Sequence, residues 1–215
     1  MKVLGIVCSP RKGGNTEIMM KEALTGASSY GAETELWTVA GKDLKFCDGC
    51  STCRKNGGQC HIKDDMQEIY PKILAAEGLI FGSPSYFASV TAQAKTVIDR
   101  LYSLYNNDLL VNKVAGVISV AGSRGHEGVS IQFNGLIELA HMFSADYAVG
   151  YGSVKGEVRK DDYAMKSAEE LGKQIVTLVK QQLRWPEEYK KSLYRSVKDK
   201  YGIESYPLRH TRQTK

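Results

Sequence analysis

Long hydrophobic runs are missing from this chain of 215 residues. No apolar segment approaches the roughly 18 residues that a membrane-spanning helix needs. The apolar stretch near the N-terminus covers only about residues 3–7, which is too short for a secretory signal peptide. We therefore expect a cytoplasmic protein that does not interact with a membrane.

An excess of charge of either sign is missing from most of the chain. The formal net charge is +5, but from residue 184 onward nine Lys and Arg residues stand against four Asp and Glu residues. The rest of the chain therefore carries 20 basic and 20 acidic side chains. Because a nucleic-acid-binding protein places a basic face on its folded domain, we expect no nucleic-acid partner.

Several enzyme motifs are also absent. The sequence contains no Ser/His/Asp arrangement and no paired carboxylates that would indicate nucleophilic or acid–base catalysis. It lacks the Gly-Lys-Ser/Thr of a Walker loop, and it lacks the G-x-G-x-x-G turn that binds dinucleotides. A tightly held dinucleotide is therefore not expected.

What the chain does have is a regular alternation of predicted strands and helices. Short apolar and β-branched runs predict strands at residues 2–8, 33–40, 78–81, 113–120 and about 146–154. Apolar residues at helical spacing predict five helices. The first begins at Asn15, the second runs from Asp64 or Asp65 to about residue 76, the third covers 94–104, the fourth covers about 128–143, and the fifth begins at Asp161 or Asp162. Gln67 and Glu68 are placed for a capping box. This rhythm indicates an α/β fold, a parallel sheet with helices on both faces.

Residues 184–215 differ in character from the main domain, residues 1–183. Pro186 ends the last domain helix, and residues 187 to about 201 are predicted to form another. Aromatic residues are frequent in this segment: Trp185, Tyr189, Tyr194, Tyr201 and Tyr206. Since disordered tails are poor in aromatics, we interpret it as a basic C-terminal arm that packs against a second subunit, in a homodimer or homotetramer.

The loop after the first predicted strand suits a phosphate group. Residues 9–16 read Ser-Pro-Arg-Lys-Gly-Gly-Asn-Thr, which brings hydroxyls, an amide, a guanidinium and glycine N–H groups to a helix N-terminus. This combination fits a phosphate monoester, and an ordinary glycine-rich turn is the alternative. In open parallel sheets ligands bind beyond the carboxyl ends of the strands, so the loops after the first, third and fourth strands should share one site.

The loops after the third and fourth predicted strands suit a flat ring. Residues 83–89 contain two aromatic and several small polar residues, and residues 121–126 contain two glycines and one cation. A flat amphipathic ring needs N–H donors at its polar edge and a backbone that approaches closely. For Tyr86 and Phe87 the alternative is an aromatic pair in the core. His126 is expected either at the ligand or on the surface.

Four of the five cysteines lie in one run, spaced C-x2-C-x2-C-x6-C: Cys47, Cys50, Cys53 and Cys60. A core scatters its cysteines, whereas four thiolates at this spacing suit an iron–sulfur cluster or zinc. A metal-free thiol or disulfide loop is the third alternative, and a reducing cytoplasm disfavours the disulfide. His61 is either a substitute ligand or a solvated loop residue. Cys8 is expected to be a small core residue.

Together these motifs resemble a known family. The start SPRxxxNT, the block SPSYFxxVTAQAKxxIDR and the third glycine loop are similar to the flavodoxin-like NAD(P)H-dependent FMN reductases. The cysteine run followed by Lys-Asp-Asp-Met is similar to the iron–sulfur flavoproteins of anaerobes. The resemblance covers roughly residues 1–183 and implies a flavodoxin-like, doubly wound sheet of five parallel strands in the order 2-1-3-4-5. The last loop departs from it, reading RGHEG where many relatives have Gly-Gly-Gln.

The resemblance also implies roles for individual residues. The FMN phosphate would be held by Ser9, Arg11, Asn15 and Thr16. The flavin would be lined by Pro84, Tyr86 and Phe87, with Ser83 and Ser89 nearby and Ala121, Gly122, Ser123, Arg124 and Gly125 at the ring edge. A 4Fe–4S cluster would be bound by Cys47, Cys50, Cys53 and Cys60.

The implied function is electron transfer by a flavin-dependent oxidoreductase. FMN exchanges one or two electrons and a cluster exchanges one, so the pair would relay electrons from ferredoxin or NAD(P)H to a small-molecule acceptor. No side chain is expected to act as a catalytic acid or base. The alternatives are a cluster-free NAD(P)H:FMN or quinone reductase, and a non-enzymatic redox carrier or sensor.

Overall fold

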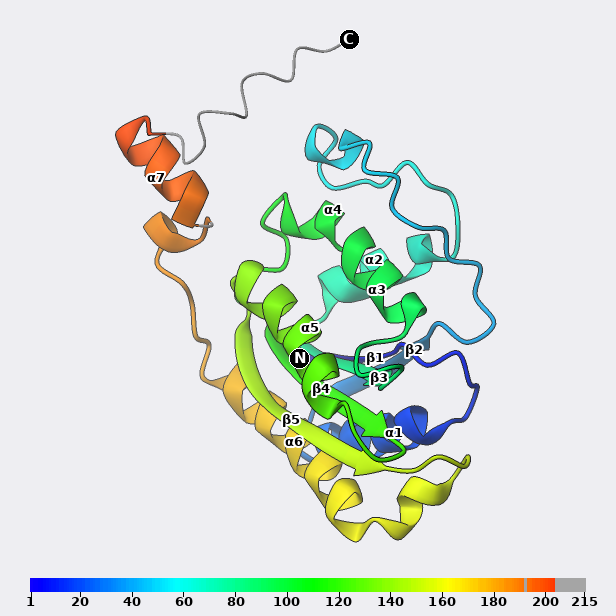
Figure 1. The fold of residues 1–215 in the computed structure, drawn as a ribbon. Helices are drawn as coiled ribbons and strands as arrows, with labels where there is room; N and C mark the ends of the chain where they lie inside the picture. Colours follow the sequence, from blue (N-terminus) through cyan, green and yellow to red (C-terminus); the bar gives the residue numbers. More distant parts are fainter. Residues whose placement is uncertain (192, 204–215) are drawn as a thin grey trace.

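A parallel sheet of five strands forms the centre of the molecule (Figure 1). The strands are β1 (Lys2–Val7), β2 (Glu33–Thr38), β3 (Gly78–Pro84), β4 (Val114–Ala121) and β5 (Phe143–Tyr151). Their order, β2-β1-β3-β4-β5, confirms the predicted flavodoxin-like topology. The computed structural model describes residues 1–191 and 193–203. The remainder of the predicted arm, including Tyr206, lies outside the described residues.

Helices cover both faces of the sheet (Figure 1). One face is covered by α1 (Asn15–Ser29) and α6 (Asp162–Lys180), and the other by α2 (Met66–Ala75), α3 (Ala92–Arg100), α4 (Tyr102–Tyr105) and α5 (His126–Leu139). Short 3-10 turns occur at Thr52–Arg54, Glu157–Lys160 and Glu187–Tyr189. Among the helices of the described part of the chain, none has the length and apolar content needed to cross a membrane.

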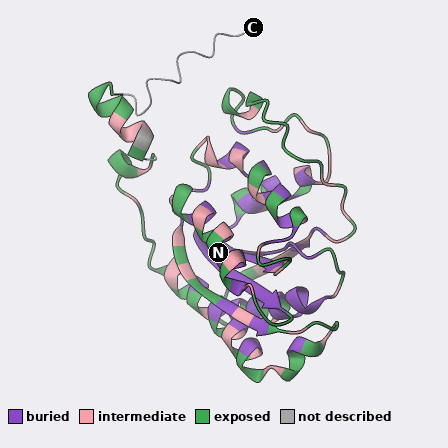
Figure 2. Ribbon diagram, in the orientation of Figure 1, coloured by how far each residue is buried: buried purple, intermediate pink, exposed green. Residues whose placement is uncertain are grey.

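Two cores result from the alternation of side chains along the buried strands. On β1, Leu4 and Ile6 belong to the core beneath α2, α3 and α5, whereas Val3 and Val7 belong to the core beneath α1 and α6. Strands β1, β3 and β4 are buried almost throughout, as expected of the centre of a parallel sheet (Figure 2). The edge strands β2 and β5 are partly exposed.

Glycine allows α1 and α6 to pack closely. A Cβ atom on Gly172 would lie 1.8 Å from the carbonyl oxygen of Ala23, and one on Gly26 would lie 2.0 Å from that of Glu169. No larger residue fits at either contact without moving a helix. This packing fixes the C-terminal half of α1, a helix whose other end begins at the predicted phosphate loop.

The helix caps and the end of the sheet test three predictions of local structure. The cap by Asp161 is confirmed, because its Oδ1 accepts a hydrogen bond from the N–H of Ala164 at 3.0 Å. The predicted capping box is wrong: Gln67 Nε2 donates to the carbonyl oxygens of Cys60 and Ile62 and does not reach back to the cap. The fifth strand begins and ends about three residues earlier than predicted, and α5 begins at His126.

The described part of the C-terminal arm contacts the chain's own domain. The ring of Trp185 lies 5.0 Å from that of His141 and 5.9 Å from that of Phe143. Beyond it, α7 (Leu193–Tyr201) is held through Arg195, whose guanidinium binds Asp108 at 3.0 Å. These contacts lie at the end of the domain that carries α4 (Figure 1).

Candidate functional site

A hollow of about 210 Å³ lies at the carboxyl ends of β1, β3 and β4. Eight of the predicted FMN-site residues line it: Ser9, Arg11, Asn15, Thr16, Pro84, Tyr86, Ala121 and Gly122. The sheet order produces this juxtaposition, because β1, β3 and β4 are neighbours and parallel strands end at the same edge. The phosphate loop and the ring loops therefore open into one space.

The N-terminus of α1 provides the strongest sign of an anion site in this hollow. The Thr16 side chain is buried, and its Oγ1 has no hydrogen-bond partner among the described residues. The first N–H groups of any α-helix also lack partners within the helix and attract anions. Gly13 adopts a φ of +65°, which lets the preceding loop turn into the helix. The residues present therefore fit a phosphate monoester.

Asn15 and Arg11 are tied to the loop that follows β5. Asn15 Nδ2 donates to the carbonyl oxygens of Gly152 and Val154 at 3.0 and 2.9 Å, and its Oδ1 accepts from the N–H of Gly156 at 2.7 Å. The amide of Asn15 is therefore committed to positioning this loop. Arg11 is exposed, and its Nη1 donates to the carbonyl oxygen of Ser153 at 3.2 Å.

The loop after β3 contains a strained turn. Tyr86 and Ser89 exchange backbone hydrogen bonds of 2.9 and 3.2 Å, and between them Phe87 and Ala88 adopt φ values of 50° and 60°. Non-glycine residues seldom adopt this conformation, and such strain occurs often at ligand sites. Phe87 is fully exposed at the tip of the turn. A surface aromatic in a strained turn fits a ring-binding role better than the core pair considered from the sequence.

The other predicted flavin residues lie around the hollow without lining it: Ser83, Phe87, Ser89, Ser123, Arg124 and Gly125. Ser83 is fully buried, and its Oγ accepts from the N–H of Thr91 and donates to the carbonyl of Pro84. Ser83 therefore stabilises the loop after β3 from its buried side. Ser123 and Arg124 are exposed. A Cβ atom on Gly125 would lie 2.3 Å from Ser85 Oγ, so the two ring loops contact each other there.

His126 is neither a surface residue nor part of this lining. It is buried at the start of α5, with Nδ1 3.0 Å from Ser119 Oγ and its ring packed edge-on against Tyr151. Burial lowers the pKa of His126, so the imidazole is neutral at pH 7.

All four cysteines of the predicted metal site line one pocket. The loop that carries them follows β2 and runs along the side of α4 (Figure 1), where Asn107 Nδ2 donates to the carbonyl of Cys53 at 3.1 Å. Burial, and then the neighbouring thiolates of Cys60 and Cys50, raise the pKa of Cys53. The four cysteines, all among the described residues, line the pocket, but no three of their sulfur atoms lie within 4.8 Å of one another. Soft thiolates in one pocket fit an iron–sulfur cluster.

Polar contacts hold the cysteine loop closed. His61 Nε2 lies 2.7 Å from Asp48 Oδ2, and Asp48 Oδ1 accepts from the N–H of Cys50 at 3.1 Å. Asp48, Cys50 and His61 also offer ligand atoms within 4.8 Å of one another, but all three are exposed. The fifth cysteine, Cys8, is fully buried as predicted, and burial raises its pKa to about 12.

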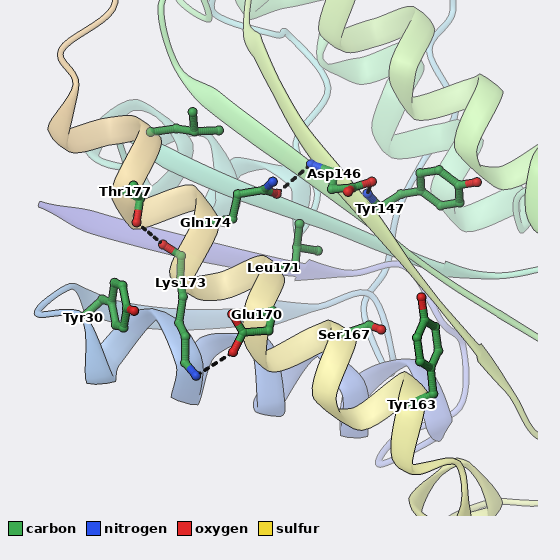
Figure 3. Close-up of a pocket in the computed structure, with 11 residues that line it drawn as sticks. Tyr30, Asp146, Tyr147, Tyr163, Ser167, Glu170, Leu171, Lys173, Gln174 and Thr177 are labelled. Atoms are coloured by element: carbon green, nitrogen blue, oxygen red, sulfur yellow. Dashed lines mark hydrogen bonds and ion pairs between the residues drawn. The ribbon is translucent and has the colours of Figure 1, made fainter.

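A larger hollow, of about 490 Å³, lies between β5 and α6 (Figure 3). Gln174 on α6 accepts a hydrogen bond from the N–H of Asp146 on β5, and Tyr147 and Tyr163 stand at the rim (Figure 3). None of the described residues that line it belongs to the phosphate, ring or cysteine loops. It has no evident link to redox chemistry.

Comparison with known proteins agrees with this geometry. The NADPH-dependent FMN reductase family matches residues 1–152, more than half of the chain. An iron–sulfur flavoprotein of Methanocaldococcus jannaschii is 38% identical over 190 residues, which cover 84% of this chain and 98% of that protein. One from Archaeoglobus fulgidus is 37% identical over 176 residues, covering 81% and 79%. This chain belongs to the iron–sulfur flavoprotein family.

Solved structures agree on the fold of this flavoprotein. RosB, with the bound intermediate 8-demethyl-8-formylriboflavin-5'-phosphate, superimposes with a TM-score of 0.73 at 18% identity, covering 96% of this chain and 89% of that one. A flavodoxin, the WrbA-like protein of Agrobacterium tumefaciens, gives a TM-score of 0.62 at 14% identity, covering 85% and 99%. Family membership makes the chain an FMN-dependent oxidoreductase.

Sequence reasoning missed several residues of the hollow and of the cysteine pocket. Gly152 and Ser153 line the hollow at the ends of β1, β3 and β4, but they lie within the predicted fifth strand. Arg100 lines the cysteine pocket from the end of α3. It was visible in the sequence only as the last residue of the SPSYF block, and no local pattern reveals a contact with a loop about 40 residues earlier.

Proposed function

We propose that this flavoprotein relays electrons between FMN at the ends of β1, β3 and β4 and a 4Fe–4S cluster bound by Cys47, Cys50, Cys53 and Cys60. The observation that carries the proposal is that all four cysteines line one pocket in a protein of an FMN-reducing family. When bound, the two groups supply two-electron and one-electron chemistry. The chain binds, orients and tunes them.

The hollow favours FMN over FAD. Thr16 Oγ1, the free N–H groups of α1 and the hydroxyl of Ser9 would bind a terminal phosphate, with Arg11 at the rim. Tyr86 and Pro84 would face the ring, Phe87 would cover it from the strained turn, and Ala121 to Gly125 would meet its edge. An adenylate would need a second nucleotide-binding motif, which the sequence lacks.

Helix α3 links the two sites. Its N-cap, Thr91, donates its hydroxyl hydrogen to the carbonyl of Cys8 and ends the strained ring loop. Its last residue, Arg100, lines the cysteine pocket. Nine helical residues span about 13 Å, so one short, rigid element would hold both cofactors in a fixed relation. This arrangement supports a relay.

The donor would be ferredoxin or NAD(P)H, and the acceptor would be a small molecule. The described residues of the hollow include no histidine or carboxylate that could move a proton. The side chains around the FMN would therefore bind and orient the ring, without taking part as acids or bases.

Replacement of one cysteine tests the proposal. Cys50→Ala should retain stoichiometric FMN but lose iron, acid-labile sulfide and the broad absorbance near roughly 400 nm of a thiolate-ligated cluster. Transfer to a one-electron partner should fail with it, while hydride transfer to FMN, if NAD(P)H is the donor, should survive. Cys8→Ala, which removes the buried thiol outside the pocket, is the matched control and should keep both cofactors. Full one-electron activity in Cys50→Ala would favour the cluster-free reductase.

A further inference from the structure

Arg100 joins the two ends of the cysteine loop. Its side chain and that of Asp64 are completely buried. Nη1 and Nη2 donate to the two carboxylate oxygens of Asp64 at 2.6 and 3.0 Å, and Nη1 also donates to the carbonyl of Lys45 at 2.8 Å. The N–H of Lys45 in turn donates to Asp64 at 2.8 Å. Lys45 precedes the first cysteine of the run and Asp64 follows the last, so the guanidinium closes the loop.

One nitrogen of this guanidinium makes no hydrogen bond to the described residues. Arg100 Nε is buried and has no acceptor among the described residues. A buried donor without an acceptor is unfavourable and calls for a bound group that satisfies it. Burial opposes the charge of Arg100, but hydrogen bonds to Asp64 outweigh it and keep the pKa of Arg100 above its ordinary value. The residue therefore presents a fixed positive charge at the pocket that the four cysteines line.

Building on the proposed function, we propose that Arg100 is a positioning residue for the cluster: it holds both ends of the loop, donates Nε–H to a sulfur atom of the cluster or its thiolates, and raises the cluster's reduction potential. Reduction adds one negative charge to the cluster. A nearby cation and a hydrogen bond to sulfur both stabilise that charge. Asp64 does not line the pocket, so the positive end of the ion pair is the nearer one.

Two variants separate this role from simple loop closure. Arg100→Lys keeps the charge but removes the Nε–H. In the double variant Arg100→Gln/Asp64→Asn both charges are absent, so no unpaired charge is left buried. Lys113→Gln is the control, because it removes a partly buried cation that does not line the cysteine pocket and that binds the carbonyls of Leu74 and Ala76. Each protein is purified anaerobically, and iron, sulfide, FMN and the midpoint potential of the cluster are measured.

We expect a more negative cluster potential in Arg100→Lys, a larger negative shift or loss of iron with FMN retained in the double variant, and no change in Lys113→Gln. Wild-type potential and full iron in both Arg100 variants would overturn the inference, and the proposed function would stand. If the double variant loses FMN as well, it has not folded, and the cluster potential of Arg100→Lys then tests the inference. Wild-type protein that contains FMN but no iron would overturn the proposed function, and this inference with it.

Discussion

At the scale of single residues, the proposed flavin site contains a buried polar group that has no hydrogen-bond partner among the described residues of the folded protein. This group is the hydroxyl of Thr16, which is buried at the start of α1. The fold gains nothing from such a group, since it loses contact with water and gains no hydrogen bond. Its presence is explained by the phosphate that we propose for this site.

Thr16→Val should therefore separate binding from stability. A lost hydrogen bond to a charged phosphate weakens FMN binding by about 1.5–3 kcal/mol, whereas the apo-protein should be as stable as wild type. Titration of apo-protein with FMN measures the first effect, and urea unfolding measures the second. Thr25→Val on the same helix is the control, because Thr25 is exposed and its Oγ1 donates to the carbonyl of Lys21, away from the hollow. Equal FMN affinity in Thr16→Val and wild type would remove Thr16 from the phosphate site.

His126 makes the stability of the fold depend on pH. Burial lowers its pKa below the ordinary value of 6.5, so the unfolded chain binds a proton more readily than the folded one. The stabilisation by neutral His126 is complete above about pH 6.5 and is lost as the pH falls below it. The free energy of unfolding should therefore fall less between pH 7.5 and pH 5.5 in His126→Gln than in wild type. His61→Gln, at an exposed position, is the comparison, and an identical pH dependence in wild type and His126→Gln would contradict this.

At the scale of elements, α6 needs its cap. Asp161 accepts from the N–H of Ala164 at 3.0 Å and from that of Tyr151, at the end of β5, at 3.3 Å. Asp161→Ala should lower the free energy of unfolding by about 1–2 kcal/mol. Asp162→Ala removes the carboxylate in the first turn of α6, which stabilises the helix through its macrodipole. This substitution should lower the free energy of unfolding by less than about 1 kcal/mol. Chemical denaturation of both variants measures the difference, and equal costs would show that the cap contributes nothing.

The elements also show how far local sequence patterns reach. Buried β-branched runs predicted β1 and β4 because their signal is contained within each strand. The end of β5 was predicted too late because the following loop is held by the side chain of Asn15, more than 130 residues earlier. The prediction of a capping box was wrong for a similar reason. Asp64 forms an ion pair with Arg100 on α3, and a local sequence pattern contains no information about that distant helix.

At the scale of the whole molecule, the C-terminal arm both contacts its own domain and exposes apolar side chains. Its described residues contact the chain's own domain through Trp185 and Arg195. Several of its apolar side chains are nevertheless exposed, Leu193 to 73% and Tyr201 to 63%. A second subunit that covers them would explain why a tail is so rich in aromatics.

Truncation before Trp185 should therefore lower the mass of the protein in solution. Light scattering after size-exclusion chromatography measures it, and FMN content shows whether the shortened domain still folds. Arg195→Ala, which removes the contacts of Arg195 with Asp108, Asn106 and the ring of Tyr105, should leave the assembly intact. A shortened, FMN-loaded protein of unchanged oligomeric state would show that the arm has another purpose.

The proposed relay requires that FMN and a thiolate-bound cluster occur together in this protein. It is tested most directly by the cofactor content of wild-type protein that is purified under strictly anaerobic conditions. We expect one FMN, four iron and four sulfide per chain, and a spectrum in which the flavin bands are superimposed on the broad absorbance of the cluster. FAD as the released flavin, zinc in place of iron, or FMN with no metal at all would contradict it.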